Sequence, residues 1–454
     1  MGTTEVINAG STTWVLVSAA LVMLMTPGLA LFYGGLVRSK SVLNMMMMNL
    51  MCLGVVTVLW VVFGYSLVFG NDIGGGLLGG LDHIGLRDAA TVVGPASDRI
   101  PLLAFAMFQL MFAVITAALL AGAIADRTKF WSWTAFIVAW TCLVYFPLAH
   151  WVFSFDGYAA ERGGWIANQL KALDFAGGTV VEINSGASAL ALALILGRRR
   201  GWPKDPMRPH NMPNVLLGAG LLWFGWFGFN AGSALAVGAV AANAFLTTMT
   251  ASAASLITWL LYEQVTDGRP TSLGAASGAI AGLVAITPGC GFVDTWGALV
   301  IGGVAGVVCA LAIKLKYRLG YDDSLDVLAL HGVGGLLGTV LIGLFATTAV
   351  NSAGADGLFY GGGVGQLGRQ ALAALVAVCY AFGVSLLLAW LVRSVLGFRV
   401  DREVEYAGID ESEHAESGYD LSLLSATARG DTGVVTAGAV ARGAARTEQE
   451  DVER

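Results

Sequence analysis

Long apolar runs constrain the fold of this chain more than any other feature of its sequence. A bilayer core about 30 Å thick needs roughly 20 apolar residues per helix. Eleven runs meet or approach that length: residues 14–36, 43–70, 101–125, 131–153, 175–197, 213–231, 239–262, 273–288, 295–313, 325–349 and 367–396. Strands of an outer-membrane barrel would instead alternate polar and apolar residues over about ten positions. The sequence therefore predicts an all-α polytopic membrane protein with eleven transmembrane helices, of which 273–288 is the shortest.

The composition excludes a soluble protein. Charged residues make up 12% of the chain, against about 25% in ordinary soluble domains. Cys52, Cys142, Cys309 and Cys379 fall inside apolar runs, so no disulfide framework is indicated. We expect a lipid bilayer as partner, with no nucleic acid, no cofactor, no metal and no enzymatic activity.

The basic residues predict the orientation of the helices. Alternate connections hold thirteen of them: Arg38, Lys40, Arg127, Lys129, Arg198, Arg199, Arg200, Lys204, Arg208, Arg269, Lys314, Lys316 and Arg318. The other connections hold only five: Arg87, Arg99, Arg162, Lys171 and Arg369. Because lysine and arginine concentrate on the cytoplasmic side, we expect the N-terminus outside and the C-terminus in the cytoplasm of a cytoplasmic-membrane protein.

Two ionisable residues lie inside apolar runs, where a charge near the bilayer centre costs roughly 3 kcal/mol. Glu182 lies in the run 175–197 and His331 in the run 325–349. Asp174 precedes the first run and Asp326 begins the second, so the fifth and tenth helices share a pattern. This pattern favours inverted repeats of helices 1–5 and 6–10, with an eleventh helix added, around a central path. A packed, hydrogen-bonded histidine is the simpler alternative for His331.

Several motifs resemble the Amt/MEP/Rh ammonium transporters. They are MTPGLALFYGGLVRSKSVLN, FQLMF, DFAGGTVVEINSGASAL, GLLWFGWFGFNAGSA and DVLALHGVGGLLGT, in order over roughly residues 10–420. The resemblance implies ammonium and methylammonium as substrates, a pore and a homotrimer.

For the pore, the resemblance implies two neighbouring histidines that are hydrogen-bonded to each other. This chain keeps the second as His331 but has Glu182 at the first position. A Glu–His pair can be carboxylate with imidazolium or two neutral groups, related by one proton transfer. Burial favours the neutral pair and mutual attraction favours the charged one, and both remain open. Trp226 either lines the pore near this pair or packs in the core.

The resemblance also implies an external site that binds ammonium and a gate below it. The matching residues are Phe108, Phe112, Phe153, Phe229 and Ser233. Most bacterial relatives have tryptophan at the position of Phe153, and tryptophan is the best cation–π partner; Trp151 should point elsewhere. Asp174 is interpreted mainly as a helix N-cap that also acts on the cation site through its field, and Asp326 as structural.

The C-terminal segment is acidic. From Asp401 onward there are thirteen acids and five arginines. We therefore divide the chain into a transmembrane domain, 1–400, and a cytoplasmic tail, 401–454, regulatory to about 420 and mobile beyond. The stretch GIDESEHAESGYD resembles the bacterial family's segment that supports regulation by a PII-type protein. Its candidate residues are Asp410, His414, Glu416 and Tyr419, with Ala415 where relatives have glycine.

Together these observations predict electrogenic ammonium uptake. Ammonium would be bound outside and deprotonated, ammonia would cross an apolar pore, and the proton would follow through Glu182 and His331. Two rivals are a neutral ammonia or gas channel of the Rhesus type and an ammonium sensor with incidental transport.

Overall fold

The computed structural model describes residues 7–95, 98–205 and 207–419. Within these residues, ten helical segments are long and apolar enough to cross a membrane: Ala9–Leu36, Ser39–Phe69, Leu102–Ile124, Phe130–Phe153, Gly178–Leu196, Met212–Gly232, Ala239–Thr266, Thr295–Leu319, Leu328–Phe345 and Gly365–Leu396. The shorter apolar helix α10 (Ser272–Ile286) corresponds to the shortest predicted span. The predicted set of eleven is therefore confirmed within the described residues, with most ends within a few positions.

The first five spans contain several joined helical pieces. They are α1 (Ala9–Leu36), α2 (Val42–Leu59) with η2 (Trp60–Gly64) and α3 (Tyr65–Phe69), α4 (Leu102–Leu119) with η4 (Leu120–Ile124), α5 (Phe130–Trp140) with η5 (Thr141–Tyr145) and α6 (Phe146–Phe153), and η7 (Gly178–Ile183) with α7 (Asn184–Leu196). A hairpin of two short antiparallel strands, β1 (Val92–Val93) and β2 (Ile100–Pro101), precedes α4.

The remaining spans follow a short connection after α7. They are α8 (Met212–Gly232), α9 (Ala239–Thr266), α10, α11 (Thr295–Ile313) with α12 (Leu315–Leu319), η8 (Leu328–Val333) with α13 (Gly334–Phe345), and α14 (Gly365–Leu396). Two short helices, α15 (Arg402–Ala407) and α16 (Ile409–His414), come after α14.

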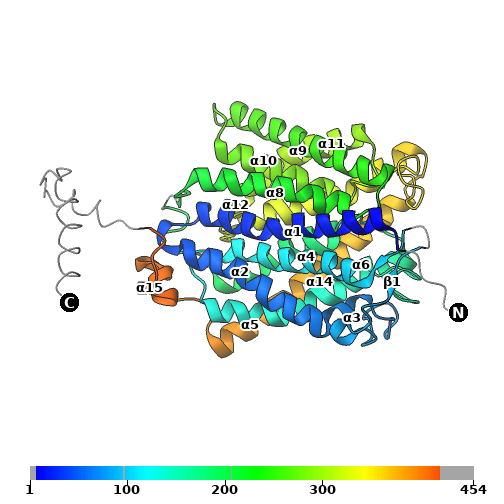
Figure 1. The fold of residues 1–454 in the computed structure, drawn as a ribbon. Helices are drawn as coiled ribbons and strands as arrows, with labels where there is room; N and C mark the ends of the chain where they lie inside the picture. The colour runs from blue at the N-terminus through cyan, green and yellow to red at the C-terminus, as the bar shows by residue number, and fades with distance from the viewer. Residues whose placement is uncertain (1–6, 96–97, 206, 420–454) are drawn as a thin grey trace, which may run out of the picture. The chain divides into compact units, whose positions relative to one another are not determined.

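Helices α1 and α8, far apart in the sequence, pack side by side (Figure 1). Glycines make this possible. A Cβ added at Gly218 would lie 2.4 Å from the backbone nitrogen of Phe32, and one added at Gly225 would lie 2.3 Å from the Met25 side chain. Small residues let helix backbones approach closely without a hydrophobic driving force between them. The first helices of the two predicted five-helix sets are therefore in close contact.

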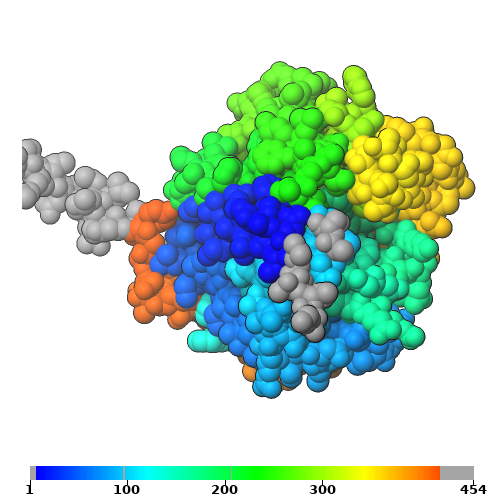
Figure 2. Space-filling view, turned by 45° about the vertical axis from the view of Figure 1, so that its right-hand side comes forward, coloured from blue at the N-terminus to red at the C-terminus, as the bar shows by residue number. Residues whose placement is uncertain are grey.

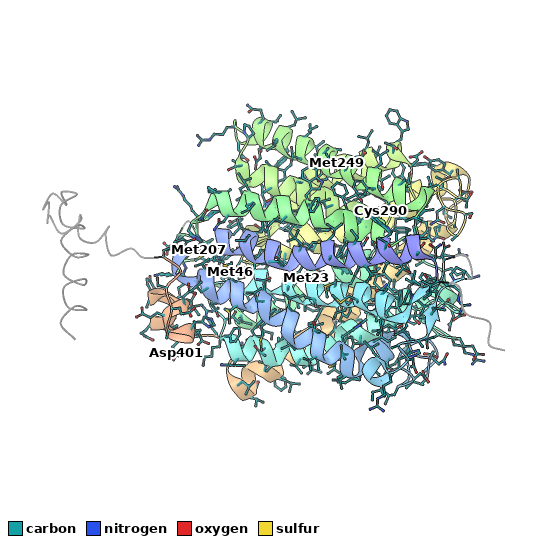
Figure 3. The ribbon with its side chains drawn as sticks, viewed as in Figure 1. Met23, Met46, Met207, Met249, Cys290 and Asp401 are labelled. Atoms are coloured by element: carbon teal, nitrogen blue, oxygen red, sulfur yellow. The ribbon has the colours of Figure 1, made fainter. Side chains whose placement is uncertain are left out.

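The ends of the helices are distinct. The start of α1 and the hairpin lie at one end, and α15 lies at the other (Figure 1). Figure 3 shows the same division. Cys290, between α10 and α11, lies toward the end with the start of α1, and Met46 and Asp401 lie toward the other end. Helix α16 packs against the beginning of α2, as Figure 2 shows where the orange segment meets the blue one.

Tertiary contacts group the chain up to Glu416 in one compact unit and the residues from Ser417 onward in another. Residues 401–416 thus pack with the membrane helices, and the predicted domain boundary at 400 remains a prediction. The predicted mobile segment, 421–454, lies outside the described residues.

Candidate functional site

Glu182 and His331 form a buried pair. His331 Nδ1 lies 2.7 Å from Glu182 Oε2, and the two residues are 4% and 0% exposed, respectively. Glu182 lies in η7 and His331 in η8, both six-residue π-helical segments that lead into α-helices. Short π-helical segments inside helices are rare and frequently mark functional sites. The two ionisable residues that the sequence singled out are therefore brought together, from matching positions in two spans.

Close backbone approach positions this pair. A Cβ added at Gly186 would lie 2.1 Å from the Cα of Gly332, and one added at Gly335 would lie 2.5 Å from the Cβ of Glu182. Any larger residue at these glycines would push the two spans apart. The second carboxylate oxygen, Glu182 Oε1, is buried and has no hydrogen-bond partner among the described residues. It remains available as an acceptor.

Asp174 caps the segment that carries Glu182. Its carboxylate accepts hydrogen bonds from the backbone N–H groups of Gly177, Gly178 and Thr179, each at 2.7 Å, and from the Thr179 hydroxyl at 2.5 Å. Burial raises the pKa of this carboxyl, and the four donors oppose the rise. Because the cap holds the chain non-helical up to Gly177, the span begins at Gly178 and not at the predicted residue 175.

The second span is capped by Asp323, which the sequence reading missed. Asp323 Oδ2 accepts a hydrogen bond from the Leu328 N–H at 2.7 Å, five positions ahead, as Asp174 does with Thr179. Asp174 precedes Glu182 by eight residues, and Asp323 precedes His331 by eight. This shared spacing could have identified the residue from the sequence alone.

Asp326 makes a structural ion pair, but it does not begin the helix. Its backbone is left-handed, with φ 64°, and its carboxylate pairs with Lys316 Nζ at 2.6 Å. The helix that it was expected to begin starts at Leu328. Asp326 is therefore an ion-pair partner ahead of the span, and Asp323 is the counterpart of Asp174.

A narrow cavity of 10 Å³ lies beside the Glu–His pair. Its other lining residues are almost all apolar: Met25, Leu29, Phe32, Ile115, Leu119, Val181, Leu222, Trp226, Phe229 and Ile280. This volume has room for about one water-sized molecule. Trp226 thus lines this cavity, and its indole N–H donates to the Thr287 hydroxyl at 2.8 Å, which fixes the ring.

A cavity of 760 Å³ lies at the end nearer the N-terminus of α1. Phe112, Phe153, Ser233 and Asp174 line it, together with Gln109, a polar residue of the FQLMF motif that sequence reasoning missed. Phe108 does not line it. Its ring packs edge-on against Phe112, at 5.0 Å between centroids, and so supports Phe112 from behind.

Aromatic rings separate this cavity from the narrow one. Phe112, which lines the outer cavity, stacks on Phe229, which lines the narrow one, with centroids 4.1 Å apart. Phe153 packs edge-on against Phe112 at 6.2 Å. Trp151 faces away, as expected, since its indole N–H donates to the Leu77 carbonyl at 2.8 Å. Phe112 and Phe229, two of the residues predicted for the gate, therefore stack between the two cavities.

Ser233 keeps an acceptor free at the outer cavity. Its hydroxyl donates to the Phe229 carbonyl at 2.8 Å. A hydroxyl has one donor and two acceptor lone pairs, so its oxygen can still accept a hydrogen bond from a cation that carries N–H groups.

A third cavity, of 380 Å³, lies on the other side of the pair. Phe32 lines both this cavity and the narrow one, and Leu330 and Asp326 line this cavity further on. Phe32 lies in the motif MTPGLALFYGG, but nothing in the sequence indicated its place at this junction. The narrow cavity beside the Glu–His pair therefore shares Phe32 with this third cavity, and the Phe112–Phe229 stack separates it from the outer one.

The tail segment is bound to the helices through its acidic residues. Asp410 accepts hydrogen bonds from the N–H groups of Leu43 and Asn44, at 3.0 and 2.8 Å, at the start of α2. Glu413, not among the predicted residues, accepts from the Phe130 N–H at 3.0 Å at the start of α5. His414 contacts Asn44 at 3.1 Å.

The remaining predicted tail residues are Glu416 and Tyr419. Glu416 is exposed and has no hydrogen-bond partner among the described residues, and Tyr419 belongs to the separate unit. Ala415 is left-handed, with φ 54°, which is the conformation that favours the family's glycine.

We expect Asp410→Ala to loosen the tail. The change removes the acceptor of two N–H groups at a helix start, and losing such a cap costs about 1 kcal/mol. Amide hydrogen exchange of residues 402–414 should then be about fivefold faster. Asp401→Ala is the matched control, because Asp401 is exposed and makes no side-chain cap. Equal exchange in the two variants would contradict this account.

Burial around Asp323 predicts a pH dependence. Its pKa is raised to about 6, chiefly by burial and then by the charge of Asp326, while Lys316 opposes the rise. An unfolded aspartate titrates near about 4, so the folded protein binds the extra proton between about pH 4 and about pH 6. The stabilising contribution of Asp323 is therefore full below this window and is lost as the pH rises through it.

Thermal unfolding of the wild type and of Asp323→Asn across this window tests the prediction. As the pH rises through this window, the free energy of unfolding of the wild type should fall relative to that of Asp323→Asn. Above about pH 6 the difference between the two should be constant. A difference that is constant throughout would show that Asp323 does not bind this proton.

The fold and the site define a polytopic membrane protein with a buried acid–base pair beside a narrow, almost entirely apolar cavity. The family model described as Ammonium Transporter Family matches residues 13–419. An ammonium transporter of Mycobacterium bovis is 55% identical over 437 residues, 92% of each chain, and one of Bacillus subtilis is 46% identical over 415 residues, 91% of this chain and 99% of its own. The chain belongs to the ammonium transporter family.

Solved structures agree with this assignment. The crystal structure of Candida albicans Mep2 is similar with a TM-score of 0.81 at 32% identity, covering 91% of this chain and 93% of that one. A structure described as a Sensor Amt Protein is similar with a TM-score of 0.80 at 30% identity, covering 89% and 98%.

Proposed function

We propose that this chain carries ammonium across a membrane by separating it into ammonia and a proton. Ammonia passes the narrow cavity, and the proton passes through Glu182 and His331. The observation that carries the proposal is the 2.7 Å Glu–His contact beside a 10 Å³ cavity whose lining is otherwise almost entirely apolar. Family membership, and the names of the relatives, support ammonium as the substrate.

The first step is binding in the outer cavity. The Ser233 oxygen accepts a hydrogen bond from an ammonium proton, which a potassium ion cannot donate. The Phe112 and Phe153 rings attract the cation by about 0.5–2 kcal/mol each. Asp174 also lines this cavity, and its negative field favours a cation there, although its oxygens already accept four hydrogen bonds.

The second step is loss of a proton at the gate. An unpaired ion that enters an apolar, water-free site loses its hydration at a cost of many kcal/mol. A neutral ammonia molecule is close to water in size, so it suits a cavity with room for about one such molecule. The Phe112–Phe229 stack opens to let it pass. Transport of the neutral molecule avoids the desolvation of the ion.

The third step moves the proton separately. The unpaired Glu182 Oε1 accepts the proton that ammonium releases, by way of water in the outer path. Oε2 exchanges a proton with His331 Nδ1 across 2.7 Å. The proton leaves toward the inner cavity and recombines there with ammonia. One NH₄⁺ disappears outside and one forms inside, so each cycle moves one positive charge.

The orientation proposed from the basic residues matches this direction. The outer cavity lies at the end with the start of α1, and α15 lies at the other end (Figure 1). The connections rich in arginine and lysine belong to the α15 end, so that end faces the cytoplasm by the positive-inside rule. The protein is accordingly proposed to lie in the cytoplasmic membrane with its tail inside.

Two assembly proposals rest on family resemblance. A homotrimer should appear as three chains in the mass of the detergent-solubilised protein. A PII-type protein should bind the cytoplasmic face near α15 and α16, and deletion of residues after 408 should abolish that binding.

Currents on solid-supported membranes after an ammonium concentration jump test the transport proposal. Proteoliposomes of the wild type should give a transient inward current, and protein-free liposomes none. A Rhesus-type neutral channel would raise ammonia permeability without any current, so permeability without current would refute the proposal. The sensor alternative predicts ammonium-dependent responses that persist in a variant without transport.

A further inference from the structure

A basic hollow lies where the tail leaves the membrane helices. It measures 470 Å³, sits at the C-terminal ends of α7 and α14, and is lined by Arg198, Arg200, Arg399, Val400, Asp401, Arg402 and Glu405. An adjoining hollow of 250 Å³ is lined by Arg38, Arg200, Asp205, Met207, Arg208, Glu405 and Tyr406. Arg200 and Glu405 line both. Six arginines therefore face three carboxylates across the two hollows.

One of these arginines is already neutralised. Arg399 binds Glu405 with Nη2 at 2.7 Å and Nε at 3.1 Å, and its Nη1 donates to the Leu196 carbonyl at 3.0 Å. Glu405 also accepts from the Arg200 backbone N–H at 2.8 Å. This network joins α15 to the end of α7. Its purpose is structural, and it uses up the one buried carboxylate of the hollow.

Three other guanidinium groups keep an excess of positive charge. Arg402 is exposed and has no hydrogen-bond or ion-pair partner among the described residues. Arg198 donates to the Gly320 carbonyl and lies 5.2 Å from the Trp202 ring, which leaves its charge without an acid. Arg200 lies 3.9 Å from Glu405, and its buried Nε has no hydrogen-bond partner among the described residues. The exposed Asp401 is the remaining acid of this hollow.

We propose that the hollow binds a phosphate-bearing anion through Arg198, Arg200 and Arg402. Guanidinium groups match phosphate oxygens in geometry and are weakly hydrated, so they are preferred for this recognition. The hollow has room for such a group without displacing the Arg399–Glu405 pair.

The hollow lies at the ends of two membrane-spanning helices, and this position favours a phospholipid headgroup as the source of the phosphate. Arg198 follows the end of α7 by two residues, and Arg399 follows the end of α14 by three. The last turn of α14 exposes Val395 and Leu396, which are 76% and 52% exposed and suit acyl chains. Basic groups at the end of a spanning helix lie at headgroup level and attract anionic lipid.

A bound phosphate would also hold the tail. Arg402 belongs to α15, whereas Arg198 and Arg200 belong to the connection after α7. One anion that contacts all three links α15 to the helix that carries Glu182. The site is therefore a point where the membrane surface stabilises the docked tail, independently of how ammonium is transported.

The test compares the wild type with two variants of equal charge. Arg198→Gln combined with Arg402→Gln removes two charges from the hollow. Arg269→Gln combined with Arg318→Gln removes two charges from exposed arginines that line neither hollow. Native mass spectrometry of the detergent-solubilised full chain counts bound phosphatidylglycerol and, as a zwitterionic comparison, phosphatidylcholine. Inorganic phosphate is tested separately by its effect on thermal unfolding.

We expect phosphatidylglycerol to bind the hollow variant about tenfold or more weakly than the wild type and the control variant. Phosphatidylcholine should bind all three alike. Stabilisation by inorganic phosphate that only the hollow variant loses would assign the site to a soluble anion instead of a lipid. If neither ligand separates the hollow variant from the control, the proposal is overturned.

Arg402→Gln alone tests for a folding defect, because Arg402 has no hydrogen-bond or ion-pair partner in the described part of the chain that the change would remove. Its unfolding temperature without ligand should equal that of the wild type. Its affinity for phosphatidylglycerol should still fall about fivefold, and an unchanged affinity would exclude Arg402 from the site.

Discussion

Glu182→Gln should reduce the ammonium-dependent current about 100-fold, the lower range of what positioned acid–base groups contribute. Glutamine has nearly the same shape as glutamate and can still hydrogen-bond to His331 Nδ1. It cannot take up or release a proton, so the pair at 2.7 Å can no longer exchange one. Solid-supported membrane currents after an ammonium jump measure the effect.

Two comparisons separate a relay defect from a damaged pore. The ammonia permeability of Glu182→Gln liposomes should persist, because the cavity keeps its size and its apolar lining. Glu182→His restores a titratable group and should retain current, with a changed pH dependence or a changed discrimination against potassium. Undiminished current in Glu182→Gln would refute the relay role, and an unmoved pH profile and selectivity in Glu182→His would refute the role of pair electrostatics.

The hydropathy of the sequence predicts the fold well for a physical reason. In a bilayer each spanning segment must satisfy its own backbone hydrogen bonds, so length and apolarity nearly determine the helix. Even α10, with 15 residues, was found this way. The predicted starts of the fifth and tenth spans, at residues 175 and 325, are too early for one shared reason. Asp174 and Asp323 lie ahead of the helix and accept hydrogen bonds from backbone N–H groups of its first residues, and apolarity does not record such caps.

The site is predictable where a motif fixes it and not where distant segments meet. Residue types and motif positions indicate Glu182, His331 and Ser233, and each of them lines a cavity. Phe108 and Phe112 lie in the same motif, four positions apart on α4, yet only Phe112 lines the outer cavity. The contact of Glu413 with α5 joins residues 283 positions apart, and no local pattern indicates it.

Asp174→Ala should destabilise the protein by about 3 kcal/mol or more and abolish transport. Alanine leaves three N–H groups at the start of η7 without their acceptor, and each buried unsatisfied donor costs about 1–3 kcal/mol. Water from the outer cavity, which Asp174 lines, relieves part of this cost. Loss of the cap also releases the segment that holds Glu182 against His331. Thermal unfolding and ammonium-dependent current measure the two effects.

Asp294→Ala is the matched control for this change. Asp294 caps α11 through a single backbone bond, to the Gly297 N–H at 2.8 Å, and it also accepts a hydrogen bond from the Tyr360 hydroxyl. Its loss should cost about 1 kcal/mol and should leave the current in place, because α11 contributes no residue to the narrow cavity. Asp174→Asn keeps one acceptor oxygen, so its loss of stability should lie between those of Asp174→Ala and Asp294→Ala. If Asp174→Ala unfolds no more easily than Asp294→Ala and still conducts, the carboxylate of Asp174 does not organise the segment that carries Glu182.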